Sequence, residues 1–172
     1  MRIIRFVVLG LLFSAMQVGA QTPDLHYRQG LRELEDGNVA GAREEFQTAK
    51  QMQKKFAPAY VGLGLVELEK GNVNGAFELL KVARKYDKKL SDIYVAKART
   101  YVAQGRKDWE KKALKELKQA QKLAPSDDRV PFFRGVIFRQ AEKYRESVAA
   151  FGKAAMMRGV LSVRAEAAQQ SV

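Results

Sequence analysis

The sequence predicts an all-α repeat protein built from helical hairpins. Three observations lead to this prediction: a self-match at a constant offset of 34 residues, apolar residues at helical spacing, and a Gly-Asn pair between successive apolar stretches. A fixed internal period is typical of repeat arrays, and an ordinary amphipathic bundle does not reproduce a dozen identities at one offset. The paired identities are Gly30/Gly64, Leu31/Leu65, Glu33/Glu67, Leu34/Leu68, Glu35/Glu69, Gly37/Gly71, Asn38/Asn72, Val39/Val73, Gly41/Gly75, Ala42/Ala76, Glu44/Glu78 and Ala49/Ala83.

The first unit shows how each hairpin is specified. Its first helix is expected to start at Thr22-Pro23-Asp24, because proline and an acid suit the first turn of a helix. That helix is expected to run to about Asp36 and to end at the turn Gly37-Asn38. Asn38 is a favourable N-cap residue, so a second helix is expected over Val39–Lys54.

The second unit resembles the tetratricopeptide repeat (TPR) family, whose period is 34 residues. The residues that carry the resemblance are Tyr60, Leu63-Gly64 and the small-bulky-small trio Ala76, Leu80 and Ala83. Small residues at Gly64 and Ala83 allow two helix backbones to approach closely. The resemblance implies a right-handed superhelix whose first helices line a concave groove, whose second helices form the convex side, and whose general role is protein binding.

The third and fourth units are less regular. Ser91 or Asp92 is expected to cap the helix that follows, and Asp127-Asp128 is expected to do the same in the fourth unit. The turn over 104–108 is expected to be longer than in the other units, and Trp109 either fills the gap beside it or is exposed at a contact site. The corresponding trios are Ala113, Leu117, Ala120 and Ser147, Phe151, Ala154.

We therefore predict an all-α TPR α-solenoid of about four helix-turn-helix repeats, with a C-terminal capping helix. The residues from Gly159 onward are rich in alanine and poor in large apolar side chains, which suits a cap. The expected repeats are about 23–56, 57–90, 91–126 and 127–158, and the capping helix is about 159–170.

Residues 1–20 have the pattern of a signal peptide. Two arginines precede the uncharged apolar run 6–16, and residues 18–20 are small, as a signal-peptidase site requires. The apolar run is too short to span the roughly 30 Å hydrocarbon core of a bilayer. We expect cleavage after Ala20 and an exported, periplasmic or envelope-associated TPR domain, 21–172, without a transmembrane segment. An uncleaved anchor is the alternative.

Composition narrows the chemistry of the chain. It has no cysteine and one histidine, His26, so Cys/His catalysis is excluded and a His/Cys metal site is implausible. We expect neither enzymatic activity nor a metal or cofactor. The formal charge is +12, and it becomes +10 when Arg2 and Arg5 are removed with the signal peptide. Nucleic acid is not the expected partner, because the chain has an export signal.

Basic residues crowd two second helices, which the TPR resemblance assigns to the convex side. A solvated face that keeps the array soluble is one interpretation, and contact with anionic lipid or cell-wall polymer is the other. This basic convex patch consists of Lys81, Arg84, Lys85, Lys111, Lys112, Lys115, Lys118 and Lys122.

The candidate protein-binding groove follows from matching first-helix positions between units. Its predicted surface is apolar in the first half and gains Arg99 and Arg139 toward the C-terminal end. We expect an apolar partner segment with an acidic end. The alternative is that the leucines are simply buried between hairpins. The predicted groove residues are Tyr27, Leu31, Leu34, Val61, Leu65, Leu68, Val95, Arg99, Val102, Phe132, Val136 and Arg139.

Overall fold

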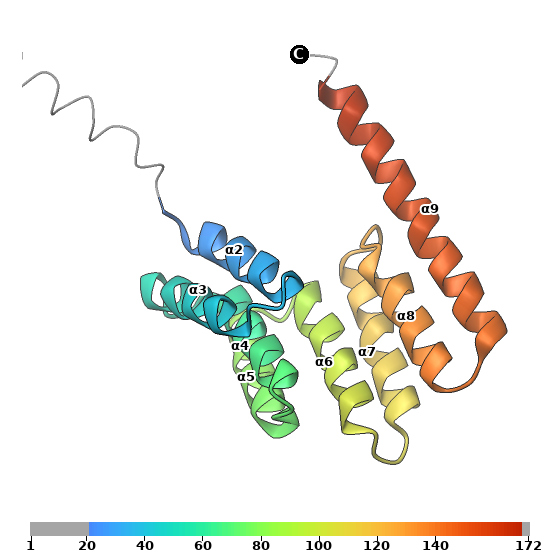
Figure 1. The fold of residues 1–172 in the computed structure, drawn as a ribbon, viewed down its shortest axis with the longest axis horizontal. Helices are drawn as coiled ribbons and strands as arrows, with labels where there is room; N and C mark the ends of the chain where they lie inside the picture. The colour runs from blue at the N-terminus through green and yellow to red at the C-terminus, as the bar shows by residue number, and fades with distance from the viewer. Residues whose placement is uncertain (1–20, 170–172) are drawn as a thin grey trace, which may run out of the picture.

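The structure, a computed structural model, describes residues 21–169, with the side chains of residues 21–160. The predicted signal peptide, 1–20, lies outside the described residues. In the part of the chain that the structure describes, eight helices follow one another as four antiparallel hairpins (Figure 1). They are α2 (Pro23–Glu35), α3 (Val39–Met52), α4 (Ala57–Glu69), α5 (Val73–Tyr86), α6 (Ser91–Gln104), α7 (Trp109–Leu123), α8 (Arg129–Gln140) and α9 (Tyr144–Gln169).

The Gly-Asn pair makes the turn of the first hairpin, as the sequence predicts. Gly37 has a φ of 79°, a left-handed conformation that glycine adopts without a steric penalty. Asn38 then caps α3, because its Oδ1 accepts a 3.0 Å hydrogen bond from the Gly41 amide. The Asn38 side chain also donates a 2.7 Å hydrogen bond to Glu33. The second hairpin repeats the same arrangement at Gly71, Asn72, Gly75 and Glu67.

Of the two predicted caps, the one at Ser91 or Asp92 is wrong and the one at Asp127-Asp128 is confirmed only for Asp127. Helix α6 begins at Ser91 itself, and its N-cap residue, Leu90, makes no side-chain hydrogen bond. Asp128 occupies the N-cap position of α8 without capping it, but Asp127 Oδ1 accepts a 3.1 Å hydrogen bond from the amide of Arg129, the first residue of α8. These acids are engaged elsewhere: Asp92 and Asp128 both bind arginine side chains.

The helices pack in a fixed order that separates an inner from an outer row. Consecutive first helices (α2, α4, α6 and α8) contact one another, and each of α3, α5 and α7 contacts the first helix that follows it. Among the described residues, the second helices do not contact one another. First helices therefore form the inner row, which is the arrangement that the TPR resemblance implies.

The predicted small-bulky-small trios lie at the helix crossings. Ala42, Phe46 and Ala49 are fully buried, as are the corresponding residues of α5 and α7. Phe46 shows why small partners are needed: a Cβ atom added at Gly30 would lie 2.5 Å from its ring, and one added at Gly62 would lie 2.4 Å from it. The ring of Phe46 thus fills the space between α2 and α4. Trp109 is half-buried and packs against the main apolar core.

The C-terminal end of the array differs from the prediction. The expected capping helix over about 159–170 is not a separate element, because α9 continues without a break from Tyr144 to Gln169. Its C-terminal half projects beyond α8 (Figure 1). Within the described part of the chain, α9 contacts α8 and no other helix. Val148 and Met156 are accordingly exposed.

Candidate functional site

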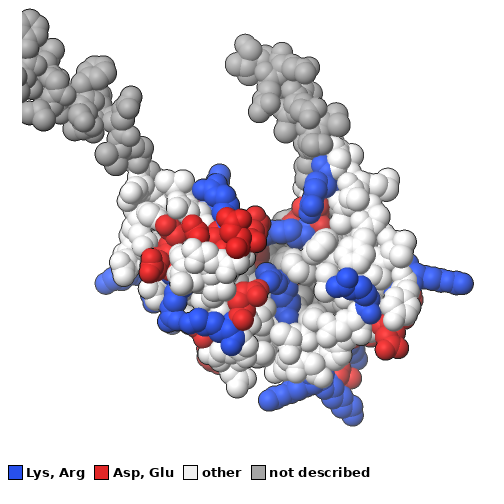
Figure 2. Space-filling view, viewed as in Figure 1, with Lys and Arg blue, Asp and Glu red and all other residues white. Residues whose placement is uncertain are grey.

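The inner row of helices encloses a hollow that crosses all four hairpins. A cavity of about 380 Å³ is lined by residues of α2, α4, α6 and α8, with Arg158 reaching in from α9. Figure 2 shows the hollow near the centre of the molecule, with acidic side chains gathered on its α2 side. A second cavity, of about 300 Å³, adjoins it between α4, α6 and α8 and shares Arg99 and Phe133 with it. The two cavities together are called the groove below.

Eleven of the twelve predicted groove residues line these two cavities, and Arg139 lines neither of them. Tyr27, Val61, Leu65 and Val95 are each less than a tenth exposed, so the groove floor is also part of the core. Burial between hairpins and exposure in a groove are therefore not alternatives at these positions. The leucines are partly buried between the hairpins and also line the groove.

Aromatic side chains form the α8 wall of the groove. Phe132 is 40% exposed, and its ring lies 5.3 Å from the ring of Phe133 in an edge-to-face arrangement. The guanidinium of Arg99 lies over the Phe133 ring at 5.4 Å, a distance at which a cation and an aromatic face attract. This wall offers partly exposed aromatic surface of the kind that dominates many binding interfaces.

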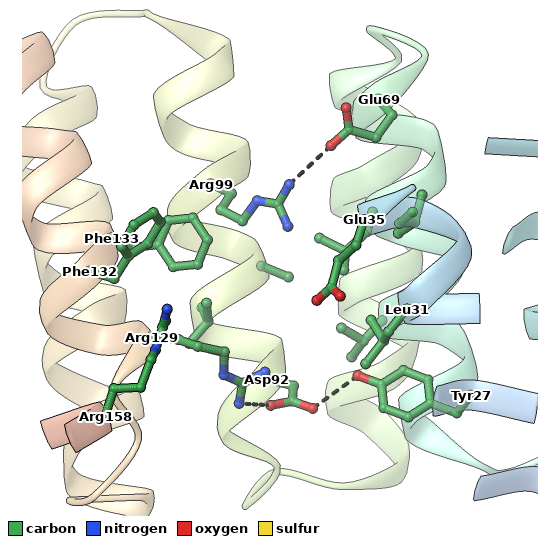
Figure 3. A pocket seen from close by; sticks show the side chains of 15 residues that line it. Tyr27, Leu31, Glu35, Glu69, Asp92, Arg99, Arg129, Phe132, Phe133 and Arg158 are labelled. Atoms are coloured by element: carbon green, nitrogen blue, oxygen red, sulfur yellow. Dashed lines mark hydrogen bonds and ion pairs between the residues drawn. The ribbon is translucent and has the colours of Figure 1, made fainter. Parts of the chain in front are cut away.

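A polar network ties three first helices together at one end of the groove (Figure 3). The Tyr27 hydroxyl on α2 donates a 3.0 Å hydrogen bond to Asp92 on α6. Arg129 on α8 donates to the same Asp92 and also binds Asp127 at 2.7 Å. Burial and the Asp92 carboxylate raise the pKa of Tyr27 well above its ordinary value. The hydrogen bond to Asp127 and the charge of Asp92 raise the pKa of Arg129, although burial opposes them.

Two further ion pairs border the groove. Arg99 on α6 binds Glu69 on α4 at 3.0 Å, so this ion pair links two hairpins. Burial lowers the pKa of Arg99, and the charge of Glu69 offsets part of that effect. Arg158 on α9 binds Asp128, at the start of α8, at 2.9 Å. The arginine that the sequence analysis left for a partner's acid, Arg99, thus already has an acidic neighbour of its own.

Sequence reasoning missed the charged residues of the groove other than Arg99. The groove also contains Glu35, Glu69, Asp92, Arg129 and Arg158. One signal for two of them was present, since Glu35 and Glu69 are paired identities at the 34-residue offset and end the first helices α2 and α4. Asp92, Arg129 and Arg158 belong to the irregular third and fourth units. There the 34-residue period does not show which side chains face a neighbouring hairpin.

The basic convex patch is exposed at all eight predicted positions, and some of its members border an outer cleft. Four of its members, Arg84, Lys115, Lys118 and Lys122, line this cleft of about 590 Å³, which also contains Tyr94, Gln119 and the ion pair of Lys97 with Glu116. Glu116 is the only acid in this lining. The cleft lies on α6 and α7 beside Arg84 of α5, away from the groove residues.

Metal binding and membrane spanning find no support in the described residues. No group of three or more His, Cys, Asp and Glu side chains comes together there in a way that could hold a metal ion. His26 instead hydrogen-bonds Glu45 through Nδ1 at 2.7 Å. Within the same part of the chain, no helix is both long and apolar enough to cross a bilayer.

The architecture is that of an all-α TPR solenoid, as the sequence predicts. The chain is similar to a thermophilic TPR protein of Thermus thermophilus, with 20% identity over 79% of this chain and 74% of that chain and a TM-score of 0.68. It is similar to MamA, with 18% identity over 87% of this chain and 85% of that chain and a TM-score of 0.56. It is also similar to PilF of Pseudomonas aeruginosa, with 22% identity over 78% of this chain and 60% of that chain and a TM-score of 0.61. No family model and no curated protein matches the sequence.

Proposed function

We propose that this protein is an exported, non-enzymatic TPR scaffold that holds another protein in its concave groove, as part of cell-envelope assembly or secretion. The observation that carries the proposal is the groove itself, whose lining comes from all four first helices. Its floor is apolar, and its aromatic wall includes the partly exposed Phe132. An amphipathic helix or an extended apolar segment is the kind of ligand that such a surface accommodates.

Partner capture tests the groove directly. The purified protein is used as bait in an envelope extract, together with Phe132→Ala and a matched control, Tyr144→Ala. Tyr144 is 64% exposed on α9 and does not line the groove. We expect the same partner with wild type and Tyr144→Ala, and strongly reduced capture with Phe132→Ala at unchanged helicity. Equal capture by all three proteins would argue that the partner binds elsewhere.

Export rests on the sequence of residues 1–20. Intact-mass measurement of the protein recovered from an envelope fraction is expected to give a chain that begins at Gln21, because the small residues 18–20 precede that position. A product that keeps Met1 in the envelope fraction would support the uncleaved anchor. A product that keeps Met1 in the cytoplasm would contradict export.

The outer cleft favours a second candidate function, an envelope protein that holds anionic lipid or cell-wall polymer. Five cations, Arg84, Lys97, Lys115, Lys118 and Lys122, face one acid in its lining. If this function is correct, wild type binds vesicles of phosphatidylglycerol, and the quadruple change of Lys111, Lys112, Lys115 and Lys118 to Glu abolishes binding. Binding should also weaken with salt, since exposed charges are screened within about 10 Å at 0.1 M. If the wild-type protein does not bind these vesicles at low salt, the basic convex patch serves only to keep the protein soluble.

A further inference from the structure

One charged group in the groove stands apart from the others. The carboxylate of Glu35, on the last turn of α2, has no hydrogen bond and no ion pair with any residue that the structure describes. In Figure 3 it points into the cavity, above Leu31 and across from the arginines of α6 and α8. Every other charged side chain that lines this cavity has a partner of opposite charge: Glu69 with Arg99, Asp92 with Arg129, and Arg158 with Asp128.

The charges of the groove lining balance, although the whole chain carries +12. The lining contains three carboxylates, those of Glu35, Glu69 and Asp92, and three guanidinium groups, those of Arg99, Arg129 and Arg158. Two acids outside the lining, Asp127 and Asp128, bind Arg129 and Arg158. Among the described residues, Glu35 is therefore the lining carboxylate that no guanidinium group neutralises.

A partner that covers the groove also covers Glu35. Removing an ionised carboxylate from water is unfavourable unless a cation or several hydrogen-bond donors replace the water. The groove's own arginines are already held by other acids, so the replacement has to come from the partner. An acidic partner segment would instead bring like charges together in a confined space, which lowers affinity.

We propose that the groove selects an apolar protein segment that carries a lysine or arginine, whose cation pairs with Glu35. This inference rests on the proposed function and specifies the chemistry of its partner. It replaces the acidic end expected from sequence, because Arg99 is paired with Glu69 and Arg139 does not line the groove. The apolar side chains of the segment lie along the floor, at Leu31 and Leu65, and against Phe132. The long, flexible stem of a lysine or arginine lets its cation reach the carboxylate from that position.

The test is a peptide selection that makes no assumption about the natural partner. A phage library of random peptides is selected at about 0.15 M salt, where long-range attraction between exposed charges is screened within about 8 Å. The targets are the purified protein, Glu35→Gln and Glu44→Gln. Glu44→Gln is the matched control, because Glu44 is an exposed acid on α3 that does not line the groove. The enriched peptides are then synthesised and tested on Phe132→Ala, which shows whether they occupy the groove.

The expected result is that wild type and Glu44→Gln enrich apolar peptides with a lysine or arginine, and that Glu35→Gln loses this preference. For one such peptide, Glu35→Gln in the protein or the basic residue→Gln in the peptide should each weaken binding about tenfold, the effect of losing one charged hydrogen bond. The two changes together should weaken binding no further than either alone. That non-additivity identifies the pair.

The outcomes separate the two proposals. Peptides that depend on Phe132 but carry no basic preference, or that prefer acids, would overturn the pairing with Glu35 while the groove remains a binding site. Peptides that bind equally well to wild type and Phe132→Ala would overturn the groove itself, and so would the absence of any enriched peptide. In both of those cases the pairing with Glu35 is overturned as well.

Discussion

The Tyr27 hydroxyl on α2 donates a 3.0 Å hydrogen bond to Asp92 on α6, 65 residues further along the chain. The bond passes over the second hairpin and directly joins α2 and α6, the first helices of the first and third hairpins. Arg129 of α8 binds the same carboxylate, so one acid fixes the mutual positions of three hairpins. In a solenoid, where most contacts join nearest neighbours, such a bond stabilises the curvature of the inner row.

Tyr27→Phe is expected to reveal this bond through the pH dependence of stability. At neutral pH the variant should lose about 1.5–3 kcal/mol, the usual contribution of a hydrogen bond to a charged group. The folded-state pKa of Tyr27 is raised above its ordinary value of 10.0, so this contribution is complete below pH 10 and declines as the pH rises through the folded pKa. Above pH 10 the unfolded tyrosine ionises first, and the advantage of wild type should shrink by about 1.4 kcal/mol per pH unit.

Urea unfolding of wild type and Tyr27→Phe at pH 8, 10 and 11 measures this difference. Tyr144→Phe serves as the control, because Tyr144 is largely exposed. A gap between wild type and Tyr27→Phe that stays constant across this range would show that Tyr27 titrates normally in the folded protein.

Ala83→Leu is expected to destabilise the second hairpin. Ala83 on α5 is fully buried and belongs to the same apolar cluster as Ile93 of α6. A leucine there must push two helices apart, and overpacking of this kind costs typically about 1–3 kcal/mol. Lys85→Leu on the exposed face of the same helix should change stability by no more than about 0.5 kcal/mol. Unchanged thermal melting of Ala83→Leu would contradict a tight crossing at this position.

Leu65 and Leu31 occupy matched repeat positions but differ in burial, so the same change should cost different amounts. Leu65 is 8% exposed, and Leu65→Ala should cost about 2–5 kcal/mol. Leu31 is only half-buried, and Leu31→Ala should cost about 1 kcal/mol, in proportion to the apolar area that it buries. Denaturant unfolding of both variants measures the difference. Equal costs would mean that the groove is narrower than the structure describes.

Much of the fold was readable because the signals are local. The Gly37-Asn38 turn and the trio Ala42, Phe46 and Ala49 are set by residues close in sequence, and the structure confirms both. The continuous α9 differs from the predicted separate cap, because an alanine-rich composition favours a helix without marking where one begins, and no proline or Gly-Asn turn interrupts α9.

The charges of the groove were not readable for a different reason. Arg99 and Glu69 are 30 residues apart, and Arg129 and Asp92 are 37 apart. Whether such side chains meet depends on the angle between successive hairpins, which the 34-residue period does not specify. The sequence predicts Asp92 as a helix cap for the same reason. Its position at the start of a helix is evident from sequence, whereas its contact with Arg129, 37 residues away, is not.

Site-specific photo-cross-linking tests the central claim, that the concave groove is the partner-binding surface. A photoreactive phenylalanine analogue replaces Phe132 in the groove, or Tyr144 on the outside of α9, in the organism that produces the protein. Both side chains are partly exposed, at 40% and 64%, so both can react with a bound neighbour. We expect one defined cross-linked protein from position 132 and none of that mass from position 144. A partner that cross-links at position 144 but not at position 132 would contradict it.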